Sequence, residues 1–259
     1  MEFISSKQNA IFKQAFKLSQ SRRDRHKTGM SLLDGAHLVC AWLDAGNDID
    51  VVMVTENGLA KPEIAGLLSR SNARKLKLSD ELFQELSELP SATGILALIK
   101  TPRPSELKTA GFCLLLDGVQ DPGNVGAILR TAHAAGVEQV WLSAQCADIW
   151  SPKVLRAGMG AQMVLPCFEN VDLPAQLKQF SGQVMVTLLD EEACDLYAAD
   201  LRGDVAVVVG SEGQGVSSEV AALATLKVYI PMQVGIESLN VGHAAAISLY
   251  EKLRQNRTT

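Results

Sequence analysis

Three polar residues near the end of the chain, Glu237, Ser238 and Asn240, interrupt a stretch that otherwise suits a buried core. They follow the apolar strand pattern at 227–232 and lie at the start of a long apolar helix pattern over 239–254. A hydroxyl or an amide there can accept a hydrogen bond from the first turn of the helix and act as its N-cap. A carboxylate, a hydroxyl and an amide together can also hold a polar ligand, so both interpretations stand at this point.

A second polar pair lies in DGVQDPGNVGAILRTAHAAG, residues 117–136. The turn residues Asp-Pro-Gly precede Asn124, which is placed to cap a helix over 125–136. Arg130 follows within that helix, whose other residues are mostly small and apolar. A buried arginine needs a partner, whereas most arginines are exposed. Arg130 is therefore either a residue of the outer face or a ligand-binding residue.

A third polar segment is VAVVVGSEGQGV, residues 205–216, an apolar strand pattern that runs into a glycine-rich loop. Glycines at 210, 213 and 215 allow the backbone to approach a ligand closely. Their spacing matches neither the dinucleotide-binding fingerprint nor a P-loop. Glu212 in the loop repels phosphates, which favours a ligand that carries a hydroxyl, an amine or a cation.

The elements that carry these loops indicate a parallel sheet. Apolar strand patterns recur at 112–117, 137–143, 184–189, 205–210 and 227–232. Strands that are apolar throughout and alternate with helices are typical of a parallel sheet covered on both faces. Ligands bind such sheets at the carboxyl ends of the strands, and each polar loop follows a strand. We therefore predict an α/β fold that brings the three loops together at one edge.

A proline-rich segment, TPRPSELK at 101–108, predicts a linker because two closely spaced prolines break helices and central strands. It separates a smaller domain, residues 1–100, from a larger one, residues 109–259. The smaller domain contains apolar strand patterns at 51–54 and 94–99.

The first 27 residues carry seven lysines and arginines but two acidic residues, although the whole chain has a net charge of −5. A basic segment on an acidic protein suits contact with an anionic polymer at one place; a solvated helix face would look the same. The five cysteines are scattered, which fits reduced, mostly buried thiols rather than disulfides or zinc ligands. The scattered cysteines thus predict a protein without metal. With no apolar signal core and no membrane-length apolar run, the sequence predicts a cytoplasmic protein that does not bind a membrane.

Together and in this order, the motifs NVGAILRTAHAAG, VVVGSEGQGV and IPMQVGIESLNVGHAAAISLYE resemble those of the SpoU–TrmH family of RNA ribose methyltransferases, over roughly residues 109–255. The segment SSKQNAIFKQAFKL, with the basic run and LLDGAHLV after it, resembles the substrate-binding domain that often precedes them. The resemblance implies a C-terminal parallel-sheet SPOUT domain with a deep trefoil knot, preceded by a smaller α/β domain that binds the RNA substrate. It also implies S-adenosylmethionine as cofactor and a homodimer with the active site at the subunit interface.

The family's functional residues carry over to matching positions. The resemblance implies a catalytic set of Asn124, Arg130, Glu212, Ser238 and Asn240. It implies cofactor contacts from Gly210, Ser211, Gly213, Ile230, Met232, Ser238 and Leu239. The basic segment supplies candidate RNA-binding residues Lys7, Lys13, Arg22, Arg23, Arg25 and Lys27.

Arg130 is a poor literal base because an arginine pKa exceeds about 12. We expect it to bind the phosphate and stabilise a developing oxyanion. The resemblance offers the alternative that Arg130 acts as the base after it loses a proton. The chain departs from the family pattern at Val234, where many members have glycine, and at Gly242-His243.

The predicted function is thus S-adenosylmethionine-dependent methylation of a ribose 2′-hydroxyl in structured RNA. The separate basic domain favours ribosomal RNA over transfer RNA. Alternatives are a non-catalytic RNA-binding or ribosome-assembly protein of this fold, and a nucleotide-dependent enzyme with a small-molecule substrate.

Overall fold

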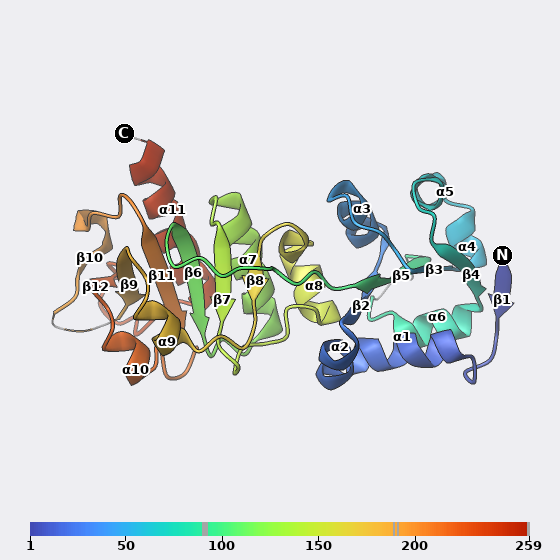
Figure 1. Cartoon of the computed structure of the whole chain (residues 1–259), viewed down its shortest axis with the longest axis horizontal. Coiled ribbons are helices and arrows are strands. Elements are labelled where there is room, and N and C mark those ends of the chain that lie inside the picture. Colours follow the sequence, from blue (N-terminus) through green and yellow to red (C-terminus); the bar gives the residue numbers. More distant parts are fainter. Residues whose placement is uncertain (90–92, 189, 191, 258–259) are drawn as a thin grey trace. The chain divides into compact units, whose positions relative to one another are not determined.

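The computed structural model describes residues 1–89, 93–188, 190 and 192–257, and the chain divides into two compact units (Figure 1). Unit 1 comprises Met1–Pro102 and Asp148–Val164, and unit 2 comprises Arg103–Ala147 and Leu165–Thr259. The sequence interpretation placed 148–164 in the larger domain; in the structure this segment packs within unit 1.

Unit 1 is built on a five-stranded sheet of order β1-β4-β3-β5-β2, in which β5 runs antiparallel to both its neighbours. Its strands are β1 (Glu2–Ile4), β2 (Met30–Asp34), β3 (Val51–Val54), β4 (Arg74–Leu78) and β5 (Ile95–Lys100). Its helices are α1 (Ala10–Gln20), α2 (Arg22–Thr28), α3 (Ala36–Asp44), α4 (Glu56–Leu59), α5 (Pro62–Ser69), α6 (Asp80–Leu86), α8 (Pro152–Gly158) and η1 (Ala161–Met163).

One side of α1 packs against one face of this sheet. Phe12, Ala15 and Leu18 of α1 join Phe83 of α6 in a core cluster with the sheet residues. Asn9 caps α1 by accepting hydrogen bonds from the first-turn amides. The lysines of α1 are consequently left on the exposed side of the helix.

The segment 148–164 is tied to the first hundred residues of unit 1 by buried contacts. Ser31 on β2 donates a hydrogen bond to the Trp150 carbonyl at 2.7 Å, and the Trp150 ring packs edge-on against Trp42. A further contact is the ion pair between Arg25 Nε and Asp148 Oδ2 at 2.6 Å, whose side chains are 6% and 5% exposed. Because these partners lie 119 to 123 residues apart in sequence, local patterns do not predict that the segment packs with the first hundred residues.

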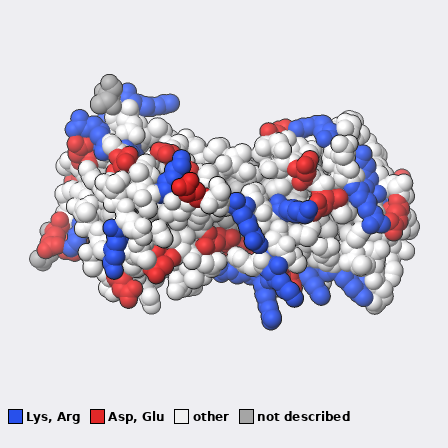
Figure 2. All heavy atoms as spheres, in the orientation of Figure 1, with Lys and Arg blue, Asp and Glu red and all other residues white. Residues whose placement is uncertain are grey.

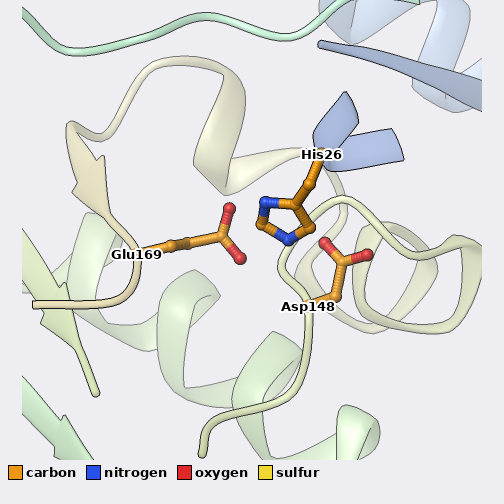
Figure 3. A group of neighbouring side chains, drawn as sticks. All are labelled: His26, Asp148 and Glu169. Carbon is orange, nitrogen blue, oxygen red and sulfur yellow. The ribbon is translucent and has the colours of Figure 1, made fainter. Parts of the chain in front are cut away.

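The Arg25 pair corrects one predicted RNA contact. Its guanidinium also donates to the Leu18 carbonyl at 2.6 Å, and Asp148 accepts a second bond from the Trp150 amide. A guanidinium used in this way is not available to a phosphate. Figure 3 shows the Asp148 carboxylate beside the ring of His26, also of unit 1; Glu169, the third residue drawn, belongs to unit 2, and no site is assigned to the three together.

Arg25→Ala should lower the free energy of unfolding by about 3–5 kcal/mol, because it leaves the buried Asp148 carboxylate without its counter-charge. Arg23→Ala, which removes an exposed arginine from the same helix, should change it by less than about 0.5 kcal/mol. Urea unfolding of the full chain measures both. Equal effects for the two variants would show that the pair is not a stabilising contact.

Unit 2 is a seven-stranded sheet of order β10-β12-β9-β11-β6-β7-β8 with every pairing parallel, which confirms the predicted fold class. Its strands are β6 (Phe112–Asp117), β7 (Gln139–Leu142), β8 (Cys167–Phe168), β9 (Gln183–Thr187), β10 (Cys194–Asp195), β11 (Val205–Gly210) and β12 (Leu226–Tyr229). Its helices are α7 (Pro122–Ala134), α9 (Leu173–Leu177), η2 (Leu196–Ala198), α10 (Ser218–Ala221) and α11 (Val241–Arg257). The strand predicted at 184–189 therefore ends earlier, and residue 189 lies outside the described residues.

Helices cover both faces of this sheet (Figure 1). Leu173 and Leu177 of α9 and Val220 of α10 pack on alternate residues of the strands, such as Ala206 and Val208 of β11. Helix α11 packs on β11 and on α7. Both faces are thus buried, which is why the strands are apolar throughout.

Three of the cysteines are buried in unit 2, as the sequence predicts, and burial raises the pKa of the Cys113 thiol to about 11. Cys40 is half-buried, however, and Cys194 is exposed. Among the described residues, no helix has both the length and the apolar character that a membrane span requires.

Candidate active site in unit 2

A pocket of about 620 Å³ lies at the carboxyl ends of β9, β11 and β12. All seven predicted cofactor residues line it: Gly210, Ser211, Gly213, Ile230, Met232, Ser238 and Leu239. Glu212 and Asn240 of the predicted catalytic set line it as well. The sheet therefore brings the first and third polar segments together, as the parallel topology predicts.

The glycine-rich loop forms one wall of this pocket because it turns back on itself. Ser211 and Gly215 exchange two backbone hydrogen bonds, each at 2.9 Å. Gly215 adopts φ +69°, a conformation that favours glycine. The turn passes so close to Gly210 that a Cβ there would lie 2.0 Å from the Gly215 carbonyl carbon. Gly210 is thus required by the backbone of its own loop.

A chain of hydrogen bonds joins all three polar segments at the rim of the pocket. Asn240 Nδ2 donates to Asn124 Oδ1 at 3.0 Å, and Asn124 Nδ2 donates to Glu212 Oε1 at 2.7 Å. These residues lie 116 and 88 apart in sequence. Because Glu212 accepts, each amide has a fixed orientation, and the network is preorganised.

Asn240 acts both as a helix cap and as a residue of the site. Its Oδ1 accepts from the Gly242 amide at 2.9 Å, at the start of α11. Its Nδ2 faces Asn124. A Cβ at position 242 would lie 3.1 Å from Asn240 Oδ1, so glycine at this position leaves room for the cap.

Asn124 lies inside its helix, which corrects the expectation that it is the N-cap. Helix α7 begins at Pro122, and the cap is Asp121, whose Oδ1 accepts from the Asn124 amide at 2.8 Å. Proline is favoured at the first helical position because it lacks an amide hydrogen. The Asn124 side chain is therefore free to bond Glu212 and Asn240.

Arg130 is exposed on α7 and makes no hydrogen bond or ion pair within the part of the chain that the structure describes. Six residues of helix place it about 9 Å along the axis from Asn124, and it does not line the pocket. Ser238 is exposed at the pocket rim, and His243 is also exposed. Val234 is fully exposed in the loop before them.

The pocket lining suits a ligand with a flat apolar part, hydroxyl groups and a positive charge. Ile230, Met232 and Leu239 supply apolar surface, and Glu212 is the one charged residue in the described lining. Sequence reasoning missed Thr187 and Leu188, which line the pocket from the end of β9. Their place directly after a buried strand is the signal that would have found them.

Five of the six predicted RNA-binding residues lie on α1 and α2 of unit 1, where Figure 2 shows a cluster of basic side chains, and Lys7 precedes α1. Lys13, Arg23 and Lys27 are exposed. Lys7 is exposed and pairs with Glu85, and Arg22, half-buried, donates to His26 at 3.4 Å. Arg25 is the exception described above.

Comparison with known proteins finds a family match for the C-terminal part of the chain and another for the N-terminal part. Residues 111–250 match the SpoU rRNA Methylase family, and residues 9–97 match the MRM3-like substrate binding domain. The chain is 32% identical to the 23S rRNA (guanosine(2553)-2'-O)-methyltransferase RlmP of Bacillus subtilis, over 96% of this chain and 98% of that protein. It is 37% identical to the 23S rRNA (guanosine-2'-O-)-methyltransferase RlmB of Shewanella oneidensis, over 88% of this chain and 98% of that protein.

A solved structure extends the similarity to the fold. The SpoU methyltransferase AviRb from Streptomyces viridochromogenes, in complex with the cofactor AdoMet, is 25% identical, with a TM-score of 0.87 over 97% of this chain and 99% of that chain. With its parallel sheet, its loops at one edge and its N-terminal substrate-binding unit, the chain belongs to the SpoU family of S-adenosylmethionine-dependent RNA 2′-O-ribose methyltransferases.

Proposed function

We propose that this enzyme methylates a ribose 2′-hydroxyl in the RNA of the large ribosomal subunit. The observation that carries the proposal is the hydrogen-bonded chain Glu212–Asn124–Asn240 at the rim of the pocket. The relatives RlmP and RlmB, both named for 23S rRNA, support the choice of substrate.

The pocket fits S-adenosylmethionine on its own chemistry. Gly210 leaves the space in which the loop closes, the apolar side chains suit an adenine ring, and Glu212 suits a nearby positive charge. Bound there, the cofactor supplies an electrophilic methyl group on a sulfonium sulfur. We assign its binding to Gly210, Ser211, Gly213, Ile230, Met232, Ser238 and Leu239.

The protein's contribution is to position the ribose and to stabilise charge. Ser238 and Asn240 at the rim hydrogen-bond the ribose and hold its 2′-oxygen toward the methyl group, which is a main part of the rate acceleration. Held in this way, the 2′-oxygen would accept the methyl group that the bound cofactor would supply, and the proton of the hydroxyl would pass to water. The Arg130 guanidinium binds the adjacent phosphate and stabilises the developing oxyanion.

Arg130 and Asn124 act in one site contributed by two subunits. The exposed position of Arg130, outside the lining of its own pocket, supports this arrangement. Exposed apolar residues on unit 2, such as Val234, Ile236 and Tyr250, support a homodimer. We also propose that the loops of unit 2 pass through one another in a trefoil knot and that the enzyme works in the cytoplasm, where reduced thiols are stable.

The proposal is tested by incubating the enzyme with methyl-labelled S-adenosylmethionine and total RNA from a strain that lacks its gene. Label should appear in large ribosomal RNA and should be recovered as a 2′-O-methyl nucleoside. Label in transfer RNA would keep the reaction and change the substrate. Cofactor binding without label in any fraction, assembly intermediates included, would favour a non-catalytic role in ribosome assembly.

Unit 1 supplies the electrostatic part of RNA binding through its basic cluster. Arg23→Ala should weaken RNA binding and should reduce the slope of log affinity against log salt by about 1, because one phosphate contact is lost. Arg257→Ala removes an exposed arginine from unit 2 and is the matched control. Equal slopes for both variants and the wild type would remove Arg23 from the RNA-binding surface.

A further inference from the structure

A second pocket, of about 550 Å³, lies on unit 2 at the carboxyl ends of β6, β7, β8 and β11. Its size falls in the range of small-molecule sites. Strand order reverses between β6 and β11, and this is the place where open α/β sheets bind ligands. No step proposed above uses this pocket.

Both loops of the reaction centre form walls of this second pocket. Ser211 and Gln214, which flank Glu212 in the glycine-rich loop, line both pockets. Gly118 and Gln120 line it from the loop that leads to Asn124. An occupant of the second pocket therefore lies next to the centre where the ribose is methylated.

The described lining of the second pocket carries three carboxylates and no lysine, arginine or histidine, so it does not suit a phosphate. The carboxylates are Asp117, Asp172 and Glu219. Leu173 and Val220 supply apolar surface suited to the face of a planar ring. The pocket thus suits a flat group with hydrogen-bond donors along its edge.

Each of the three carboxylates has at least one oxygen that is free to accept a further hydrogen bond. One oxygen of Asp117 accepts from the Ser217 amide at 2.8 Å, and one oxygen of Asp172 accepts from the Ala175 amide at 3.1 Å. The other oxygen of each makes no hydrogen bond within the described residues, and neither oxygen of Glu219 does. A carboxylate is an acceptor only, so this pocket selects donors.

We propose that the second pocket receives the base of the nucleotide whose ribose is methylated, and that its carboxylates select guanine. Bases recognised in RNA are unstacked and bonded along the Watson–Crick edge. On that edge guanine presents two adjacent donors, N1–H and the N2 amino group. Adenine and cytosine present one donor beside an acceptor, and uracil presents one donor between two acceptors. The inference rests on the proposed function, and guanosine in the names of RlmP and RlmB agrees with it.

The first test is the identity of the methylated nucleoside, which should be 2′-O-methylguanosine. A synthetic RNA fragment that spans the modified position is then made with guanosine or with inosine, which lacks the 2-amino group. The wild-type enzyme should prefer guanosine by roughly 10-fold in kcat/KM, because a charge-assisted hydrogen bond is lost with inosine.

The variants should reduce this preference. Asp117→Asn keeps an oxygen for the Ser217 amide but turns the free acceptor into a donor, so the guanosine-to-inosine ratio should fall below about 3. Glu219→Gln, whose carboxylate makes no hydrogen bond in the described structure, is the second variant if the first folds poorly. Asp195→Asn is the control, because that carboxylate caps η2 and lines neither pocket. S-adenosylmethionine affinity should stay unchanged in all three.

Methylation of a nucleoside other than guanosine would overturn this inference and leave the proposed function standing. A wild-type ratio near 1, or a ratio unchanged in both Asp117→Asn and Glu219→Gln, would overturn it as well. The absence of label in any RNA would instead overturn the proposed function, and this inference with it.

Discussion

Arg130→Ala should lower RNA methylation by about 10²–10³-fold and leave S-adenosylmethionine affinity unchanged, because removing one group that stabilises transition-state charge has an effect of this size. The side chain is exposed and bonds no described residue, so its loss should not disturb the fold. It does not line the cofactor pocket, so cofactor binding should persist. Single-turnover methylation and equilibrium binding of the labelled cofactor measure the two effects separately.

Two further variants separate charge from position. Arg130→Lys keeps the charge but loses bidentate contact with a phosphate, so it should recover part of the activity. His133→Ala, which changes an exposed residue on the same helix, should have little effect. Activity within about 3-fold of wild type for Arg130→Ala would exclude it from the catalytic set, since an electrostatic stabiliser should cost far more. If Arg130→Ala lowered S-adenosylmethionine affinity as well as activity, Arg130 would belong to the cofactor pocket.

Mixing two inactive variants tests whether the site is shared between subunits. If Arg130 acts on the partner's Asn124 network, a dimer of one Arg130→Ala subunit and one Asn124→Ala subunit contains one intact site. After random exchange, about one quarter of wild-type sites should be restored, as expected for a two-fold symmetric interface. If both residues act within one subunit, mixing should restore nothing.

The sequence predicts the site in unit 2 well because its residues follow the ends of buried parallel strands. That rule places the glycine-rich loop and the segment of Ser238 and Asn240 at one edge. It does not predict that Asn124 and Glu212, 88 residues apart, share a hydrogen bond at 2.7 Å. Such a contact depends on strand order and register, which local patterns do not encode.

The errors have a similar origin. The run Asp-Pro-Gly-Asn offers two candidate caps, and the choice of Asp121 over Asn124 follows from proline at the first helical position. Arg25 lies in a basic segment of the kind that contacts RNA. Its burial follows from its ion pair with Asp148, which is distant in the sequence. Strand β1 of unit 1 and strands β8 and β10 of unit 2 were not predicted because they have only two or three residues. Strands β2 and β4 of unit 1 were not predicted because they mix polar with apolar residues.

Gly210→Ala should remove S-adenosylmethionine binding almost completely and should lower the free energy of unfolding by about 3 kcal/mol or more, the upper end for overpacking. The added Cβ would lie 2.0 to 2.1 Å from the Gly215 carbonyl and the Val216 amide nitrogen. These are backbone atoms, so no side-chain rotation relieves the contact, and the loop that forms the pocket wall must move. Isothermal titration with the cofactor and urea unfolding measure the two losses.

Gly213→Ala in the same loop is the matched control. Apart from its chain neighbours, no atom of the described residues lies within 4 Å of a Cβ at this position, so the free energy of unfolding should change by less than about 1 kcal/mol. A larger loss of cofactor affinity for Gly210→Ala than for Gly213→Ala would show that the closed turn builds the pocket. Equal losses would mean that glycine serves the ligand directly at both positions, and unchanged binding in both would move the cofactor to another part of unit 2. Because the same turn holds Glu212 against Asn124, Gly210→Ala should also lose methylation at saturating cofactor, whereas Gly213→Ala should keep it.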